Sequence, residues 1–295
     1  MRTSWMQRVM ALACAVGVIA GMGVQPAGAA FPGRNGKIAY DIAGTIRSIW
    51  ANGTGSKMIV GRAAGPVSQP AWSADGKRLT FVRQARDHFT HIWVKDMATG
   101  RQTQVTSNPR YDGQPAWSPD GTKIAFVTAT RAIYTIGSTR PFGARHLVFA
   151  APPEDFASDP VWSADGTKIA FEYYDHTAGT NIAVVPADGS SLPVVLTHNG
   201  YSSTPAWSPD GTKIAYSAPW LNVMNADGTG NRSFVVTESD IYNLAWSPDG
   251  TRIAAAIDWQ YTTVIITMNP QTGAWIKDDV AANVDGGLDW QPLPA

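Results

Sequence analysis

The sequence predicts an all-β fold, a closed ring of six four-stranded antiparallel blades, from three observations. Tryptophans recur at nearly constant spacing, a twelve-residue phrase accompanies most of them, and the two ends of the chain carry complementary halves of that phrase. The composition agrees with strands joined by tight turns, because glycine (28 residues) and proline (20) are plentiful and only 16% of residues are charged.

The repeat is marked by tryptophans that follow one another at steps of 45, 45, 45, 39 and 44 residues. These are Trp72, Trp117, Trp162, Trp207, Trp246 and Trp290. A period of about 40 to 45 residues is typical of one four-stranded propeller blade. In the unit that begins at Pro115, we expect the first strand to carry Trp117 and the next three to cover Lys123–Val127, Ala132–Ile136 and His146–Phe149.

The phrase "PAWSPDGTKIAF" predicts a tight turn between the first two strands of each blade. Ser118, Pro119, Asp120 and Gly121 suit the four positions of a type I turn, with the glycine at positive φ. The turn aspartates of the five copies are Asp75, Asp120, Asp165, Asp210 and Asp249. Because these turns are nearly identical from unit to unit, we expect a structural role for them.

The ends of the chain predict how the ring closes. Asn35–Tyr40 resembles the back half of the phrase without its tryptophan strand, and Gly287–Pro292 resembles the front half without its turn. Together they form one complete unit, so the C-terminal strand is expected to join the N-terminal strands. Five internal units and this composite unit give six blades, and closure removes exposed sheet edges.

The first thirty residues predict a secretory signal peptide. Arg2 and Arg8 precede an apolar run, Val9–Val24, which is followed by small residues before Phe31. We therefore expect an exported protein, secreted or held in the periplasm or cell envelope, whose residues 31–295 form a single propeller domain. A signal segment retained as a membrane anchor is the alternative, and the remaining sequence contains no other candidate membrane span.

Composition excludes several classes of function. The only cysteine, Cys14, lies in the signal segment, so neither disulfides nor thiolate metal sites are expected in the domain. Removal of the segment leaves 21 basic against 23 acidic residues, a formal charge of −2. This balance argues against nucleic-acid binding, which needs a strongly basic face. We expect a monomer without a cofactor.

At these repeats the sequence resembles the TolB-type, WD40-like (PD40-repeat) propeller family, whose repeats carry the phrase P-x-W-S-P-D-G-x-x-I-A-F. The resemblance covers nearly all of residues 31–295, and it is specific for fold more than for function. TolB carries an extra domain ahead of its propeller, so its partners are not carried over to this chain. The G-x-S-x-G elbow of propeller-bearing peptidases is missing from this sequence, which argues against a serine peptidase.

One face of the ring collects the connections that differ between units, and we expect the binding site there. Its candidate residues form a basic arc and an aromatic arc that suit an extended ligand such as a peptide or a sugar polymer. The basic candidates are Arg83, Arg86, His88, Arg110 and Arg131. The candidates of the other arc are Tyr173, Tyr174, Trp220, Trp259 and Tyr261, with His176 beside them. The alternative is that the arginines form a solvated rim and the aromatics cover blade edges.

A polar ring is expected at the mouth of the central channel, three positions before each tryptophan. Its members are Gln69, Gln114, Asp159, Thr204 and Asn243, with Gly287 in the last copy. Such groups suit water, a cation or a partner's backbone. The five histidines, His88, His91, His146, His176 and His198, fall at unrelated places in their units, so no metal site is predicted.

Three functional hypotheses follow. The first is an exported, non-enzymatic propeller that binds a protein or polymer through the variable face. The second is a propeller glycan lyase, glycan hydrolase or lactonase that uses loop acids or histidines. The acids available to it are Asp87, Asp112, Glu154, Asp155, Asp175, Asp240, Asp258 and Asp285. The third is a purely structural module of the cell envelope.

Overall fold

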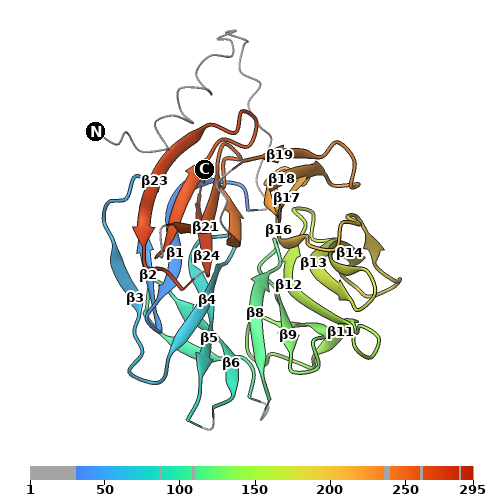
Figure 1. Ribbon diagram of the computed structural model, residues 1–295. Coiled ribbons are helices and arrows are strands. Elements are labelled where there is room, and N and C mark those ends of the chain that lie inside the picture. Colours follow the sequence, from blue (N-terminus) through green and yellow to red (C-terminus); the bar gives the residue numbers. More distant parts are fainter. Residues whose placement is uncertain are drawn as a thin grey trace, which may run out of the picture.

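The computed structural model shows an all-β ring of six four-stranded antiparallel sheets (Figure 1). It describes residues 31–86, 88–107, 110–235, 240–259, 262–285 and 287–294. The expected signal peptide, residues 1–30, lies outside these described residues. Within them, no helix is long and apolar enough to cross a bilayer. The predicted fold class is confirmed, including the number of blades.

In every blade the four strands follow one another from the ring axis outward. Blade 1 contains β24 (Leu288–Leu293), β1 (Arg34–Ile42), β2 (Thr45–Ile49) and β3 (Lys57–Val60). Blade 2 contains β4 (Val67–Trp72), β5 (Arg78–Gln84), β6 (Thr90–Asp96) and β7 (Gln102–Gln104). Blade 3 contains β8 (Asp112–Trp117), β9 (Lys123–Thr128), β10 (Ile133–Gly137) and β11 (His146–Phe149).

The other three blades repeat this order. Blade 4 contains β12 (Phe156–Trp162), β13 (Lys168–Asp175), β14 (Gly179–Pro186) and β15 (Val194–Val195). Blade 5 contains β16 (Ser203–Trp207), β17 (Lys213–Ala218), β18 (Trp220–Asn225) and β19 (Arg232–Phe234). Blade 6 contains β20 (Ile241–Trp246), β21 (Ile253–Trp259), β22 (Thr262–Met268) and β23 (Trp275–Ala282). The strands expected for the Trp117 unit match blade 3 to within one residue at each end.

The C-terminal strand closes the ring, as the two half-phrases predict. β24 pairs antiparallel with β1, and Trp290 stands opposite Ile38. In Figure 1 the red β24 and the blue β1 lie side by side although they come from opposite ends of the chain. The indole nitrogen of Trp290 donates to the carbonyl oxygen of Gly36 at 3.2 Å. Closure therefore includes a buried side-chain contact as well as a strand ladder.

The repeated tryptophans form the joints between neighbouring blades. Trp117 is 1% exposed and donates its indole N–H to the carbonyl oxygen of Ala71 in the preceding blade at 3.2 Å. Trp162 and Trp246 make the equivalent bonds to Ala116 and Ala206. Each of these indoles thus packs into the interface between two sheets while its polar atom is satisfied.

The Asp-Gly turns are held by one set of side-chain hydrogen bonds in all five copies. In blade 4, the hydroxyl of Ser163 donates to Asp165 at 2.6 Å and accepts the amide N–H of Lys168 at 3.0 Å. The hydrogen bond from Ser163 lowers the pKa of Asp165, so the carboxylate stays charged. Gly166 has a φ of 70°, the left-handed conformation that the phrase predicts for its glycine.

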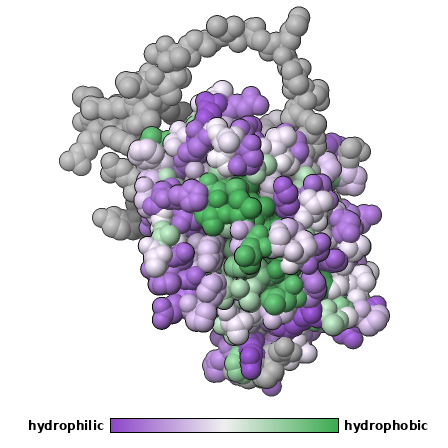
Figure 2. Space-filling view, turned by 90° about the vertical axis from the view of Figure 1, so that its right-hand side faces the viewer, coloured by the Kyte–Doolittle hydropathy of each residue, from purple (hydrophilic) through white to green (hydrophobic). Residues whose placement is uncertain are grey.

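The outer side of blades 3 to 5 exposes large apolar side chains. Figure 2 looks at the right-hand side of Figure 1, where these blades lie, and shows an apolar stretch across that side. The exposed apolar residues of the outer strands and their neighbouring turns are Leu147, Leu192, Val194 and Val235. They offer contact surface but no group for chemistry, so they are suitable positions for control substitutions.

Candidate functional site

A cavity of about 520 Å³ lies on the ring axis. It is lined by the innermost strand of every blade, and in blade 2 its lining runs from Ser68 to Trp72. The cavity therefore extends along the inner strands from the level of the expected polar ring to the level of the tryptophans. All five predicted ring residues and Gly287 belong to its lining.

The ring residues sit where the backbone bends. Gln69, Gln114, Asp159 and Thr204 have φ values of 54°, 54°, 49° and 50°. In each of these four blades the pairing of the inner strand with its neighbour shifts at this position, as in a β-bulge. Non-glycine residues at positive φ are uncommon and store strain, so four equivalent cases at one level mark a shared structural requirement.

Hydrogen bonds between neighbouring blades stabilise these bends. The amide N–H of Gln114 donates to the side-chain oxygen of Gln69 at 2.7 Å, and that of Asp159 donates to the side-chain oxygen of Gln114 at 3.2 Å. Each glutamine thus satisfies the backbone of the next blade. The side-chain oxygens of Gln69 and Gln114 are therefore already occupied by structural hydrogen bonds and are not free for a ligand.

Two carboxylates from second strands take over this role elsewhere in the ring. Asp41 of β1 accepts the amide N–H groups of Gln69 and Gly287, both at 2.8 Å. Glu172 of β13, at the equivalent place in blade 4, accepts the amide N–H of Thr204 at 3.4 Å. A Cβ atom at Gly287 would lie 2.5 Å from Asp41 Oδ2, which explains why the sixth ring position is glycine.

Asp41 and Glu172 were not among the residues that the repeat pattern singles out. A signal for them was present in the sequence, because each follows the phrase end "KIAY" or "KIAF" directly. Other copies carry Val82, Val127 or Ser217 at that position. An acid at the end of an otherwise apolar strand is unusual when the strand is buried, and it indicates a specific partner.

Three acids that line the cavity, Asp41, Asp159 and Asp289, have raised pKa values. Burial raises the pKa of Asp159 to about 7, and the nearby Glu172 charge adds to the shift. Burial raises the pKa of Asp289 to about 7 and that of Asp41 to about 6, although both accept backbone hydrogen bonds. No lysine, arginine or histidine belongs to the described lining of the cavity. The axial cavity is therefore an acidic environment with little charge compensation.

Replacement of Asp159 by asparagine is expected to stabilise the protein at pH 8. The folded-state pKa of about 7 exceeds the ordinary value of 3.8, so the native state binds more protons than the unfolded state between these values and loses stability as the pH rises. We expect Asp159→Asn to increase the free energy of unfolding by about 2 kcal/mol at pH 8, or the Tm by roughly 4–8 °C. Calorimetry at pH 8 and pH 4 checks this, because at pH 4 and below the parent and the variant should have similar Tm values. An unchanged Tm at pH 8 would show that the charge on Asp159 does not destabilise the folded state.

The basic arc is only partly where the sequence predicts it. β5 continues to Gln84, so Arg83 lies in a strand and not in a loop, which corrects that placement. Its side chain is 6% exposed, and its guanidinium donates to Gln102 at 2.8 Å between the rings of Phe81 and Trp93. Arg83 is therefore part of the interior of blade 2.

The other members of the basic arc lie at the surface. Arg86, His88 and Arg110 are exposed, and no hydrogen bond of the described structure fixes the ends of their side chains. Arg131, also exposed, lies over the ring of Phe156 at 4.4 Å. These positions agree equally with a ligand-binding rim and with a solvated one.

The aromatic arc is partly tied into blade 4. Tyr173 and Tyr174 belong to β13, where Tyr174 stacks on Phe156 with ring centroids 4.6 Å apart. Trp220 begins β18 and is 41% exposed. Trp259 ends β21, but its side chain is not described, and Tyr261 lies outside the described residues. The members of this arc with described side chains thus lie in blades 4 and 5, and their role in ligand binding stays a prediction.

Three exposed tyrosines that the sequence analysis did not select lie within three positions of ring residues. Tyr111 (39% exposed) and Tyr201 (60%) precede the ring residues Gln114 and Thr204 by three positions. Tyr242 (46%) directly precedes Asn243 and lines the cavity. The sequence carries a signal for two of these tyrosines, because aromatic residues recur at steps of 45 positions at Tyr111, Phe156 and Tyr201. We call Tyr111, Tyr201, Trp220 and Tyr242 the aromatic rim.

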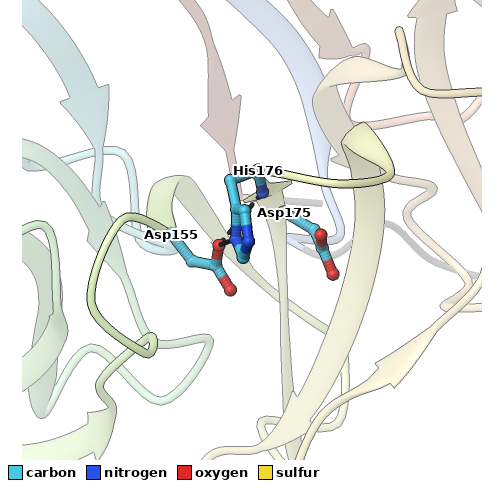
Figure 3. A group of neighbouring side chains, drawn as sticks. All are labelled: Asp155, Asp175 and His176. Atoms are coloured by element: carbon cyan, nitrogen blue, oxygen red, sulfur yellow. Dashed lines mark hydrogen bonds and ion pairs between the residues drawn. The ribbon is translucent and has the colours of Figure 1, made fainter.

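Asp155, Asp175 and His176 come together on the variable face of blade 4 (Figure 3). One ligand-type atom of each lies within 4.8 Å of the others. The ring nitrogen Nδ1 of His176 is 2.8 Å from Asp155 Oδ1, and Tyr173 donates its hydroxyl to Asp155 Oδ2 at 3.0 Å. The hydrogen bond from the His176 side chain lowers the pKa of Asp155, whereas burial and Asp155 raise the pKa of Tyr173 to about 12.

The positions of the histidines in their units gave no signal for this group, and the prediction of no metal site stays a prediction. Asp155 comes from the connection between blades 3 and 4, and Asp175 and His176 come from the end of β13 and its following turn. Asp175 also accepts the amide N–H and the hydroxyl of Thr177, at 2.7 and 2.6 Å. Two carboxylates and an imidazole are donors that a divalent ion accepts, but most of these donor atoms already take part in hydrogen bonds.

The closed ring of six four-stranded blades around an axial cavity places the chain in the class of six-bladed β-propellers. The family model of the TolB beta propeller domain (PD40) matches residues 45–268, so the chain belongs to the TolB-like PD40 propeller family. The resemblance expected from the repeated phrase is confirmed.

Solved structures agree on the fold. TolB from Acinetobacter baumannii is 19% identical, with 87% of this chain and 67% of that chain covered and a TM-score of 0.69. A chain of a nidogen/laminin complex is 11% identical, covering 88% and 99%, with a TM-score of 0.73. An oligogalacturonate lyase in complex with manganese is 16% identical, covering 86% and 73%, with a TM-score of 0.54. Likenesses at this level of identity show the fold alone.

Proposed function

We propose that this protein is an exported, non-enzymatic propeller of the cell envelope or extracellular space that binds a protein or an extended polymer. The ligand contacts the variable face and reaches the mouth of the axial cavity. The proposal for export rests on residues 1–30, whose charged start, apolar run and small-residue end are typical of a signal peptide. The TolB family membership agrees with an envelope location.

The observation that carries the binding proposal is the aromatic rim beside an open cavity. Tyr111, Tyr201 and Tyr242 are 39% to 60% exposed at the ends of inner strands, where a rigid sheet holds their backbones. Tyrosine offers a large contact area together with a hydroxyl group and loses little side-chain entropy on binding. Exposed aromatics around a concave mouth are therefore suited to be the anchors of an interface.

The test is retention of a ligand by immobilised protein. We expect residues 31–295 to retain one discrete protein or polysaccharide from the envelope of the native cell. The combined variant Tyr111→Ser, Tyr201→Ser and Tyr242→Ser should weaken binding of that purified ligand at least about tenfold, since interface anchors contribute about 2 kcal/mol or more each. Isothermal titration calorimetry measures the affinity, and circular dichroism verifies that the variant folds.

The matched control removes three large apolar side chains elsewhere. Trp50→Ser, Leu147→Ser and Leu192→Ser alter side chains that are 41%, 46% and 82% exposed and that do not line the cavity. This control should bind like the parent. Equal loss in both triple variants, or loss in neither, would contradict a binding site at the aromatic rim.

An enzymatic function is the second candidate, because Asp155, Asp175 and His176 bring two acids and an imidazole together. If this group performed catalysis, the protein would cleave a polysaccharide or a lactone, and His176→Ala or Asp155→Asn would abolish turnover. We expect no turnover of polygalacturonate, chitin or simple lactones with or without Mn²⁺. Turnover that depends on either residue would replace the non-enzymatic proposal.

A further inference from the structure

The chain of hydrogen bonds around the mouth stops at one ring residue. Gln69 and Gln114 each accept the amide N–H of the following blade, but the amide of Thr204 donates to Glu172 instead of Asp159. Glu172 therefore accepts the amide N–H of the following blade, which in the two preceding blades is accepted by a glutamine at the ring position. The carboxylate of Asp159 accepts no hydrogen bond from the part of the chain that the structure describes, and Asp159 lines the cavity.

A second unpartnered group occupies the next ring position. The hydroxyl oxygen Oγ1 of Thr204 is buried and makes no hydrogen bond within the described residues, and Thr204 also lines the cavity. Buried polar atoms without a partner are rare because each costs free energy of desolvation. Asp159 is half-buried, and its carboxylate also lacks a hydrogen bond within the described residues. Two neighbouring ring positions whose side-chain oxygens lack partners indicate that a bound group completes their hydrogen bonds.

The acceptor set identifies the chemistry of that group. Asp159 offers two carboxylate oxygens and Thr204 one hydroxyl oxygen, and a primary ammonium has three N–H donors and no acceptor. The remaining acids of the cavity lining, Asp41, Asp285 and Asp289, add negative potential, and no basic residue of the described lining opposes it. A calcium ion takes six to eight oxygen ligands, which is more than these three.

We propose that the axial cavity binds a primary ammonium group, held between the Asp159 carboxylate and the Thr204 hydroxyl. This inference deepens the proposed function, on which it rests, because it states which chemical group of the ligand enters the cavity. A lysine side chain of a protein partner and a free alkyl amine share this chemistry. Tyr111 and Tyr242 at the mouth supply aromatic faces beside the entry, and such faces also attract cations.

The test is calorimetric titration of residues 31–295 with small probes at pH 8, above the Asp159 pKa of about 7. N-acetyl-lysine amide represents the protein source, and 1,5-diaminopentane represents the free amine. N-acetyl-norleucine amide, which has the same stem without the charge, is the neutral control, and CaCl₂ tests for a metal site. We expect both ammonium probes to bind and the norleucine derivative to bind at least about tenfold more weakly.

Two variants locate the site. Asp159→Asn and Thr204→Val keep the size of each side chain, and each should weaken the ammonium probes, Asp159→Asn by at least about tenfold. The control Asp227→Asn removes one charge from the β18–β19 turn outside the cavity and should bind like the parent. Tighter binding of the lysine derivative than of the diamine assigns the ammonium to a protein partner, and the reverse order assigns it to a free amine.

Three results would overturn this inference. They are equal binding by Asp159→Asn and the parent, equal binding of the norleucine and lysine derivatives, and binding of Ca²⁺ without binding of either amine. These results leave the proposed function standing if the aromatic-rim variant still loses the envelope ligand. Conversely, ammonium binding together with an intact ligand affinity of the rim variant would overturn the proposed function alone.

Discussion

Removal of residues 286–295 is expected to open the ring and to abolish most of the stability of the protein. The deletion takes away β24, including Trp290 and Leu288, which are 2% and 4% exposed. Truncation of a buried tryptophan alone costs about 3–5 kcal/mol, and the whole stability of a domain is about 5–15 kcal/mol. We expect a fall in Tm of roughly 10–20 °C or loss of a cooperative transition, measured by calorimetry.

The physical reason is that β24 joins blade 1 to blade 2 as well as closing blade 1 itself. It pairs with β1 inside blade 1. Asp289 accepts the amide N–H of Trp72 at 2.6 Å, and the Gln291 side chain donates to the carbonyl oxygen of Gly76 at 2.9 Å, both in blade 2. Without β24, the edge of β1 would be free to pair with another molecule, so the truncated protein should also associate.

A circular permutant shows whether the truncated protein is unstable because the ring is open or because the deleted residues are needed at the C-terminal end. Residues 287–290 placed ahead of residue 36 and joined through a Ser-Pro-Asp-Gly turn recreate the continuous phrase of the internal blades. This variant should regain most of the lost Tm and elute as a monomer from a sizing column. A truncated protein with an unchanged Tm and a single monomer peak would contradict closure by β24.

The fold was predictable because the repeat specifies each blade locally. The serine, aspartate and glycine of the turn make the same hydrogen bonds in every copy, so one phrase predicts five turns. The half-phrases at Lys37 and Trp290 predict closure for the same reason, since β24 and β1 pair in the register of an internal blade. Sequence patterns of this kind depend on neighbouring residues alone.

The site was less predictable because its contacts join blades that differ. The positions of Gln69, Gln114 and Asp159 followed from the period, but their roles depend on which neighbour satisfies the next amide. Only the ring geometry shows that Glu172 takes this role in blade 4 and leaves Asp159 without a hydrogen bond among the described residues. Residue type alone does not distinguish a carboxylate that holds the backbone of a neighbouring blade from one that is free to bind a ligand.

Strand ends were the other source of error. Arg83 was assigned to a loop, but β5 extends past it, and alternation places it on the same face as Phe81. Tyr173 and Tyr174 were likewise assigned to a connection and lie in β13. An arginine buried between two aromatic rings contributes packing through its stem and its planar head, and composition alone does not distinguish it from a solvated rim residue.

Replacement of Arg145 by methionine is expected to destabilise the protein by about 3–5 kcal/mol. The guanidinium of Arg145 donates two hydrogen bonds to Asp112, at 2.9 and 2.7 Å, and lies over the ring of Phe126. The Asp112 side chain is 1% exposed, so the variant would leave a buried carboxylate without its counter-charge. Urea unfolding at pH 7 measures the difference, and Arg140→Met, an exposed arginine of the same loop, should stay within about 0.5 kcal/mol of the parent.

The double variant Asp112→Asn with Arg145→Met tests whether the loss comes from the stranded charge. Removal of both charges should recover most of the stability, because the cost of a broken buried pair exceeds the net contribution of the intact pair. A double variant as unstable as Arg145→Met would assign the loss to packing against Phe126.

The Asp112 carbonyl also accepts the hydroxyl of Thr90 from blade 2, at 3.1 Å, and Asp112 follows Tyr111 directly. The ion pair therefore fixes the backbone on which one tyrosine of the aromatic rim stands, so Arg145→Met should also weaken ligand binding, whereas Arg140→Met should not.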